Sequence, residues 1–212
     1  MADNLFSFGA LSLTHEWRLA RLRQIAALFA LALLIVLSSS PALAYKVYVS
    51  NEKGNSISVL DSDSMEVIKT IKVGQRPRGI TVSKDGKFLY VCASDDDTIE
   101  IIDTSTYEIV GTLPSGPDPE LFVLSPDGKV LYVANEDDNL VTVIDLEKRS
   151  VVAEIPVGVE PEGMGVSPDG KTVVNTSETT NMAHFIDTAS HEITQPNRGS
   201  VVTGHLCLNA PH

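Results

Sequence analysis

Short apolar runs and polar turn residues alternate along this chain, and the same order recurs at a fixed step. Asp61, Asp103, Asp145 and Asp187 are each separated by 42 residues. Between two such positions the runs are rich in Val and Ile and bounded by Gly, Asn, Asp or Ser, which predicts β-strands. In the clearest copy, residues 129–170, the predicted strands are 130–134, 140–145, 150–155 and 163–167. A period of about 40–50 residues with four strands per copy is typical of propeller blades.

Other position types keep the same period. These are Gly74, Gly116 and Gly158, together with Pro77, Pro119 and Pro161. Copies begin at residues 46, 87 and 129, and a fourth begins at residue 171. We therefore expect an all-β fold, a β-propeller of four-stranded antiparallel blades, with about three and a half blades in residues 45–191.

The fourth copy departs from the pattern near its end. Pro196, Asn197, Arg198 and Gly199 stand where the period predicts a Val-rich strand, so we expect them to interrupt it. We interpret residues 192–212 as an atypical C-terminal tail, produced either by truncation or a frameshift or by an unusual end repeat. The first copy lacks an inner strand before Lys46. An incomplete ring exposes two sheet edges, so we also expect self-association through them.

Two kinds of turn repeat with the strands. Residues 125–128 and 167–170 read Ser-Pro-Asp-Gly, in which Pro presets φ and Gly accepts positive φ. The second kind follows a strand-ending Asp, whose carboxylate can accept nearby backbone N–H groups. Because this Asp recurs in every copy, we assign it a structural turn role rather than a catalytic one, at Asp61, Asp103, Asp145 and Asp187.

Residues 1–44 have the organisation of a secretory signal peptide. Arg18, Arg21 and Arg23 precede an unbroken apolar run at 25–37, and small residues follow up to Ala44. The alternative is an uncleaved membrane anchor, but the run is shorter than the roughly 20 residues that a spanning helix needs. We expect cleavage after Ala44, a periplasmic location and no stable membrane insertion of the mature chain.

The net charge is −12, with 28 acidic and 16 basic side chains. Binding to nucleic acid or to an anionic membrane needs Lys and Arg against phosphates, so this balance argues against both. Two interpretations of the excess acid remain open. It keeps a β-rich protein soluble, or it forms a functional face.

Many of the carboxylates fall in loops that a propeller would bring to one end of its blades. We name this set the acidic loop face, and it comprises Asp95, Asp96, Asp97, Asp118, Glu120, Glu136, Asp137, Asp138, Glu160 and Glu162. Arg76 and Arg78 are the strong countercharges nearby. Such a face suits a cationic protein partner, a small ligand or an oxygen-ligated divalent ion. The alternative is a solvated rim of turn-forming residues, and the spacing assigns no metal site.

The sequence contains no motif of a known catalytic type. It has no Cys-x-x-Cys-His, His-Glu-x-x-His, Gly-x-Ser-x-Gly or phosphate loop, so we assign no catalytic residue and no cofactor. His184 lies on a predicted strand, where a packed or solvent-facing side chain is a more common outcome than a ligand. Cys92 falls within a strand and Cys207 within the tail, and no disulfide is assigned between them.

Several segments resemble the YVTN-type β-propeller repeat, notably Tyr48-Val49-Ser50-Asn51, Tyr132-Val133-Ala134-Asn135 and the Ser-Pro-Asp-Gly turns. The resemblance covers about residues 46–190 and implies part of a seven-bladed ring. The leader and residues 181–187 look most like the periplasmic propeller associated with pyrroloquinoline-quinone-dependent alcohol catabolism.

This likeness implies a non-catalytic binding or scaffold protein that is accessory to a quinoprotein oxidation or transport system. One alternative is a propeller enzyme or cofactor-maturation protein that binds a haem-like or quinone cofactor. Another is a cell-surface adhesion module, as some relatives of the repeat are.

Overall fold

A computed structural model describes Trp17, residues 21–26 and residues 45–198. The chain divides into two units, Met1–Ala44 and Tyr45–His212. Residues 21–26 are helical, and most of the predicted signal peptide lies outside the described residues. No helix in the described part of the chain is long and apolar enough to cross a membrane.

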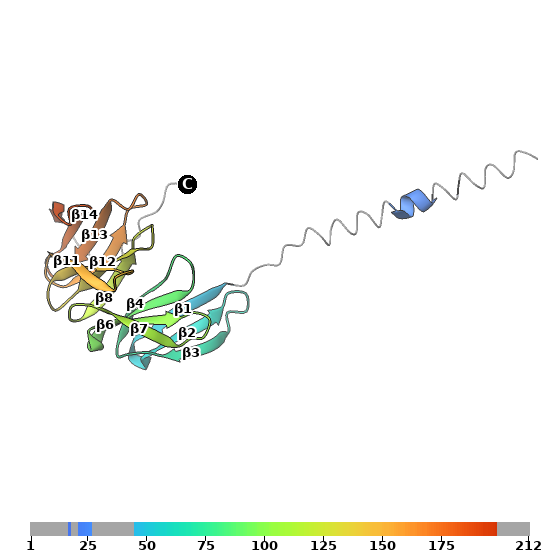
Figure 1. The fold of residues 1–212 in the computed structure, drawn as a ribbon, viewed down its shortest axis with the longest axis horizontal. Helices are drawn as coiled ribbons and strands as arrows, with labels where there is room; N and C mark the ends of the chain where they lie inside the picture. The colour runs from blue at the N-terminus through green and yellow to red at the C-terminus, as the bar shows by residue number, and fades with distance from the viewer. Residues whose placement is uncertain (1–16, 18–20, 27–44, 199–212) are drawn as a thin grey trace, which may run out of the picture. The chain divides into compact units, whose positions relative to one another are not determined.

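The second unit is built from four antiparallel sheets, which confirms the all-β, propeller-type fold (Figure 1). Sheet A has three strands, β1 (Lys46–Asn51), β2 (Ser56–Asp61) and β3 (Val67–Lys72). Sheet B has four, in the order β4 (Pro77–Val82), β5 (Phe88–Ala93), β6 (Thr98–Asp103) and β7 (Ile109–Pro114).

The other two sheets repeat the plan of sheet B. Sheet C consists of β8 (Pro119–Leu124), β9 (Val130–Asn135), β10 (Leu140–Asp145) and β11 (Ser150–Pro156). Sheet D consists of β12 (Pro161–Val166), β13 (Thr172–Ser177), β14 (Met182–Asp187) and β15 (Ile193–Arg198). Short 3₁₀ turns, Glu52–Gly54 and Ser94–Asp96, follow β1 and β5.

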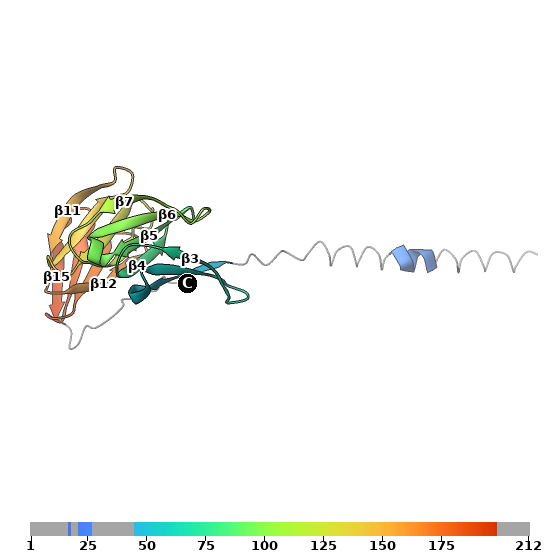
Figure 2. The same ribbon diagram turned by 90° about the horizontal axis from the view of Figure 1, so that it is seen from below.

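The sequence repeat and the sheets are offset from each other. One 42-residue copy supplies the second to fourth strands of one sheet and then the inner strand of the next sheet. The inner strands β4, β8 and β12 lie beside one another in that order, and β1 lies beside β4 (Figures 1 and 2). β12 begins at Pro161, two residues before the predicted start at 163, and β4 and β8 likewise begin at their Pro, because Pro is tolerated as the first residue of a strand.

Three apolar clusters pack between neighbouring sheets. Ile57, Val59, Ile71, Leu89, Val91 and Ile102 join sheets A and B. A second cluster, centred on Ile99, Leu131 and Val133, joins sheets B and C. A third, which includes Val141, Val173 and Ile186, joins sheets C and D. The alternation of buried and exposed positions along each strand directs alternate side chains to opposite faces, so one sheet contributes to two clusters.

The expected interruption of the fourth strand of sheet D is wrong as far as Arg198. The backbone of β15 pairs with β14, with Pro196 opposite His184 and Arg198 opposite Met182. The physical reason is position: β15 is the outermost strand of its sheet, and an edge strand tolerates a residue that lacks an N–H donor. Gly199 and the rest of the predicted tail lie outside the described residues.

Candidate functional site

At the end of each sheet opposite the acidic loop face, the repeating Asp fixes the turn that follows its strand. Asp145 accepts backbone N–H groups from Glu147 at 3.0 Å and Lys148 at 2.9 Å. Asp61, Asp103 and Asp187 accept the equivalent pairs of N–H groups. Backbone N–H groups at Asp61 and Asp187, and at Asp103 first the Ser105 hydroxyl and then the N–H groups, stabilise the charged form and hold the pKa of each of these carboxyls below its usual value. The bonds at Asp61, Asp103 and Asp187 all go to one carboxylate oxygen, Oδ1, and bridge two or three residues along the chain, which is the geometry of a turn lock.

A second repeating lock fixes the loops at the other end. Asn55 and Asn139 adopt left-handed backbone conformations, and each side-chain oxygen accepts a backbone N–H from 21 residues further on. Asp97 occupies the same place in sheet B and accepts the N–H of Asp118 at 3.0 Å. Asp97 is therefore tied to the loop architecture. Asn55, Asp97 and Asn139 keep the 42-residue step, so the pattern was available in the sequence.

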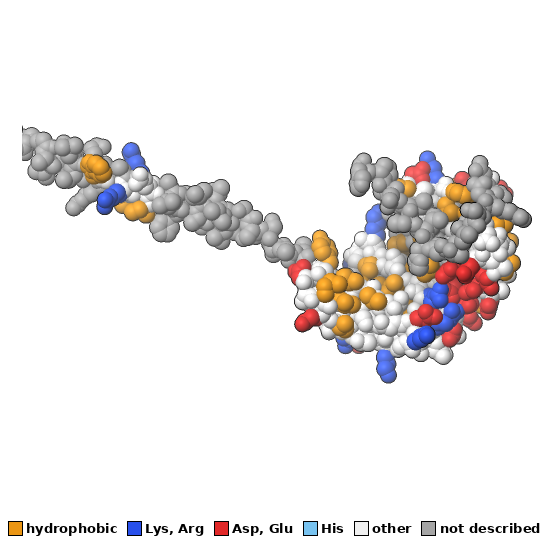
Figure 3. All heavy atoms as spheres, turned by 180° about the vertical axis from the view of Figure 1, so that it is seen from behind, with side chains coloured by type: hydrophobic (Ala, Val, Ile, Leu, Met, Phe, Trp, Pro, Cys, Tyr) orange, Lys and Arg blue, Asp and Glu red, His pale blue; other side chains and the backbone are white. Residues whose placement is uncertain are grey.

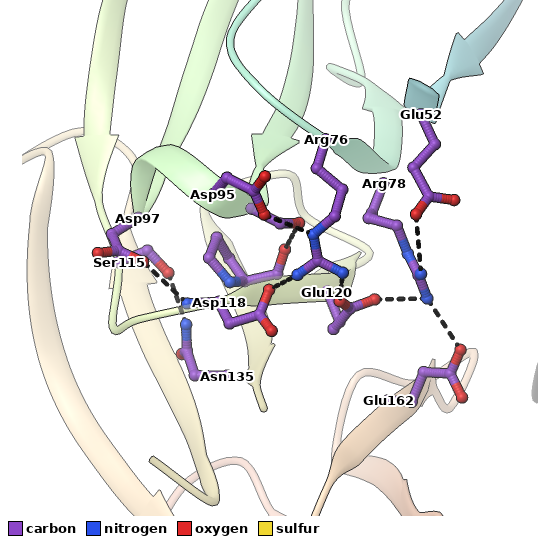
Figure 4. Close-up of polar contacts among 12 residues, drawn as sticks. Glu52, Arg76, Arg78, Asp95, Asp97, Ser115, Asp118, Glu120, Asn135 and Glu162 are labelled. Carbon is purple, nitrogen blue, oxygen red and sulfur yellow. Dashed lines mark hydrogen bonds and ion pairs between the residues drawn. The ribbon is translucent and has the colours of Figure 1, made fainter. Parts of the chain in front are cut away.

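Two arginines, one from a loop and one from a strand, contact acidic side chains that come from all four sheets (Figure 4). Arg76 precedes β4 in a left-handed conformation, and its guanidinium contacts Asp95 at 2.7 Å, Glu120 at 2.9 Å and the carboxylate of Asp118. These contacts join the loop before β4 to the end of β5 and to β8.

Arg78 lies two residues further along, on the inner strand β4. Its Nη2 atom is 2.5 Å from Glu120 and 3.1 Å from Glu162, and its Nη1 atom is 3.7 Å from Glu52. Both arginine side chains are about one quarter exposed, whereas the side chain of Glu120 is 1% exposed. Glu120 is thus a buried carboxylate bridged by two arginines, which a sequence pattern could not show.

Three carboxyl groups converge beside this bridge. Oxygen atoms of Asp118, Glu120 and Glu136 lie within 4.8 Å of one another. Burial raises the pKa of Glu120 to about 7; Arg78 and Arg76 oppose the rise, and Glu136 adds to it. Arg76 and Arg78 already contact carboxylate oxygens of Asp118 and Glu120, so a divalent ion at this trio would compete with two guanidinium groups for its oxygen ligands.

The remaining members of the acidic loop face are less closely joined. Asp96 accepts two hydrogen bonds from Gln75, one from its backbone N–H at 2.7 Å and one from the side-chain amide of Gln75 at 3.1 Å. Glu160 accepts a hydrogen bond from Thr179. Asp137 and Asp138 are exposed in the turn between β9 and β10. Acidic and basic side chains gather together on one face of the unit (Figure 3).

A shallow cavity of about 330 Å³ opens beside Arg78. Its lining includes Ser50, Glu52, Leu121 and Glu162. A second hollow, of about 230 Å³, adjoins Arg76 and Asp95. Both cavities are lined by charged groups from several sheets, which suits a polar or charged group of a partner.

His184 is packed rather than presented to solvent. It is 4% exposed on β14, opposite Asn175 of β13. Its Nδ1 atom is buried without a hydrogen-bond partner, and burial lowers its pKa. Cys92 is also fully buried, with a free thiol whose pKa burial raises, so it behaves as a core residue.

The comparisons with known proteins agree with the propeller architecture. Residues 42–109 match the family described as "Lactonase, 7-bladed beta-propeller", and residues 90–196 match the family described as "Cytochrome D1 heme domain". A solved structure of Kuenenia stuttgartiensis hydrazine synthase is similar, with 30% sequence identity, a TM-score of 0.67 and 71% of this chain covered. The present chain covers 45% of that protein, less than half its length. No curated protein matches the sequence.

The sheet-by-sheet geometry and the family match lead to the same assignment. The matched residues 90–196 run from β5 to β15 and amount to half of the 212 residues. The chain therefore belongs to the cytochrome D1 heme domain family and is a β-propeller protein.

Proposed function

We propose that this protein is a periplasmic, non-catalytic binding propeller whose acidic loop face recruits a cationic partner. The observation that carries this proposal is the charge balance at the two arginines. Arg76 and Arg78 together contact five carboxylates, those of Glu52, Asp95, Asp118, Glu120 and Glu162. Two positive charges among five carboxylates leave the centre of the face acidic.

The face is also held in place before a partner arrives. The side chains of Asn55, Asp97 and Asn139 fix the loops before β4, β8 and β12 by the same hydrogen bond. Preorganised charges lose little conformational entropy on binding, and complementary charge increases the rate of encounter. These features support a protein partner that bears Lys or Arg side chains.

The resemblance to propellers of pyrroloquinoline-quinone-dependent alcohol catabolism supports a more specific context. We propose that the partner belongs to a quinoprotein oxidation or transport system of the same compartment. In this context the propeller would act as an accessory or scaffold component. The signal peptide predicted in residues 1–44 supports the periplasmic location.

A capture experiment tests the proposal. We expect the immobilised protein to retain a partner from a periplasmic extract, and to lose it when exposed carboxylates of the face are neutralised in Asp95→Asn, Asp137→Asn, Asp138→Asn. The matched control neutralises three exposed acids in the turns at the opposite ends of the sheets, Asp63→Asn, Glu108→Gln, Glu147→Gln. Equal retention by both triple variants would contradict the proposal. Raised salt should also release the partner.

The family match motivates a second candidate, a protein that binds a haem-like or quinone cofactor. Haem iron in proteins is held by His, Cys, Met or Tyr side chains. Of the described histidines, His184 is buried between sheets C and D, and His191 lies in the turn after Asp187. Met164 of β12 and Cys92 are buried in the clusters between sheets.

The loop face therefore presents no described histidine or cysteine to a haem iron, and we derive no chemistry through one. Arg76 and Arg78 could pair with cofactor carboxylates only by giving up their present partners. Incubation with haem or with pyrroloquinoline quinone, followed by desalting, separates the two candidates. A retained visible absorption band would favour the cofactor, and a colourless protein would favour the binding propeller.

A further inference from the structure

Lysine side chains link neighbouring sheets at the end of the sheets opposite the acidic loop face. Lys84, in the turn between β4 and β5 of sheet B, donates a hydrogen bond from Nζ to the carbonyl oxygen of Pro126 in sheet C at 2.7 Å. Lys46 of sheet A donates to the carbonyl oxygen of Thr104 at 3.3 Å, and its ammonium group lies 4.8 Å from the centre of the Tyr107 ring. Both junctions therefore hold a lysine ammonium group that the chain itself supplies.

The junction of sheets C and D lacks a lysine in the corresponding place among the described residues. Lys84 lies against Gly128, and 42 residues later Pro126 lies against Gly170. The proline ring closes on its own backbone nitrogen, so it carries no ammonium group to the next sheet. No described side chain donates to the carbonyl oxygen of Pro168, which is the equivalent of the acceptor at Pro126.

A cavity of about 290 Å³ opens at this junction instead. At the junction of sheets B and C, Phe88 and Leu146 pack beside Tyr90. One period later the corresponding residues are Val130 and Thr188, which are smaller and which both line the cavity. Together with the exchange of Lys for Pro, these smaller residues leave open a space that side chains fill one junction earlier.

The lining of the cavity suits a cation. It includes the carboxylates of Asp127 and Asp169 and no Lys or Arg side chain. The turn hydrogen bonds of both carboxylates go to Oδ1, and the exposed Lys171 lies 3.7 Å from Oδ2 of Asp169. Tyr132 also lines the cavity and is 4% exposed, and its hydroxyl makes no hydrogen bond with a described residue. An aromatic ring attracts an ammonium group in addition to the carboxylates.

We propose that this cavity between sheets C and D binds a primary ammonium group on a short alkyl chain, either the lysine side chain of a partner protein or a free small amine. The ammonium group takes the role that Lys84 has one junction earlier and lies beside Asp127 and Asp169. The alkyl chain contacts Tyr132 and Val130. A volume of about 290 Å³ is at the small end of the range for ligand sites, so it suits a single side chain or a small amine.

The site is independent of the function proposed for the acidic loop face, because it lies at the other end of the sheets. Sheets C and D are the neighbours that contribute it, through the turns that precede β9 and β13 and the turn that follows β14 (Figures 1 and 2). Failure of the partner at the acidic loop face would therefore leave this proposal standing, and the reverse also holds.

Titration of the full-length, isotope-labelled protein with n-butylammonium chloride, followed by NMR, tests the site. We expect saturable shifts of the amide signals of Asp127, Val130 and Gly170, with half-saturation at roughly millimolar concentration because the probe has few atoms. Neutral n-butanol has the same number of non-hydrogen atoms and should bind about tenfold more weakly or worse, because it offers no charge to the carboxylates. Equal binding of the two probes, or the absence of saturable shifts at these amides, would overturn the proposal.

A second probe distinguishes the two sources of the ammonium group. N-acetyl-lysine N-methylamide presents a lysine side chain as a protein does. Binding of this probe as tight as that of n-butylammonium would identify the lysine of a partner protein as the ligand. Binding about tenfold weaker or worse would identify a free amine, because the peptide groups then clash with the rim of the cavity.

Two variants close the cavity with residues that sheet B already uses. Pro126→Lys copies Lys84 and supplies an ammonium group from the chain, whereas Val130→Phe copies Phe88 and fills the space without adding charge. Each should weaken n-butylammonium binding about tenfold or more, because each removes the open volume. Circular dichroism verifies that both variants keep the fold. Wild-type affinity in both variants would overturn the proposal.

A matched pair of charge variants completes the test. Asp127→Asn keeps Oδ1 for the bonds of the turn and removes one carboxylate from the cavity, so it should weaken n-butylammonium binding several-fold. Asp85→Asn removes the same charge from the equivalent turn of sheet B and should leave the affinity unchanged. Equal effects of the two substitutions would place the probe outside the cavity and overturn the assignment.

Discussion

Glu120 should give the stability of this protein an unusual dependence on pH. Burial, opposed by Arg78 and Arg76, raises the pKa of its carboxyl from 4.5 to about 7. Between these two pH values the folded protein binds more protons at this group than the unfolded chain does. The free energy of unfolding contributed by Glu120 therefore falls as pH rises from about 4.5 to about 7 and is level above that.

The magnitude follows from the two pKa values. Their difference of about 2.5 (7 − 4.5) corresponds to at most about 3 kcal/mol at 1.36 kcal/mol for each unit of pKa. The side chains of Arg78 and Arg76, which contact Glu120, are 26% and 27% exposed, so solvent screens part of the interaction. We therefore expect an effect of about 1–2 kcal/mol.

The substitution Glu120→Gln keeps the length of the side chain and removes its titration. The unfolding free energy of the variant minus that of the wild type should rise by about 1–2 kcal/mol between about pH 5 and about pH 8. Urea denaturation followed by circular dichroism at a series of pH values measures this difference. Other titrating groups are common to both proteins and cancel to first order.

A surface substitution provides the control. Glu154 is exposed on the outer strand β11, and Glu154→Gln should give a difference that changes little with pH. If the Glu120→Gln difference were flat across this range, or fell with rising pH, burial would not dominate the titration of Glu120. The account of the two-arginine bridge would then be wrong.

Three further outcomes follow from the structure. Leu131→Ala should cost about 2–5 kcal/mol of unfolding free energy in urea denaturation, because it empties a fully buried site between sheets B and C; a cost below about 1 kcal/mol would contradict this packing. Burial lowers the pKa of His184, so wild-type stability should be lost as pH falls below about 6.5, and His184→Thr, which copies Thr142, should reduce that loss; an unchanged pH profile would refute it. Asp97→Asn should leave the melting temperature nearly unchanged, because Asn55 and Asn139 make the same lock, whereas Asp97→Ala should lower it.

Much of the fold was predictable because its repeating contacts are local. The strand-ending Asp145 and its turn involve neighbours two and three residues away, so sequence pattern and structure coincide there. The predicted strands 140–145 and 150–155 agree with β10 and β11 to within one residue. Alternation of apolar residues encodes such elements directly.

The site was predictable only in outline. Arg76 and Glu120 are 44 residues apart, and Arg78 and Glu162 are 84 residues apart, so their meeting depends on how neighbouring sheets dock. Sequence placed the carboxylates at one end of the sheets but could not distinguish buried Glu120 from exposed Asp137. The expected break at Pro196 was wrong because the pattern does not show that β15 is an edge strand.

The offset between the sequence repeat and the sheets has a consequence for unfolding. Each inner strand belongs by covalent connection to one repeat and by hydrogen bonding to the next sheet, as β12 does between residues 129–170 and sheet D. Unfolding of one sheet therefore also releases a strand that is covalently part of the preceding repeat. Unfolding is then expected to extend along the chain rather than stay within one copy. Amide protons of neighbouring sheets should accordingly exchange with solvent as a single cooperative block.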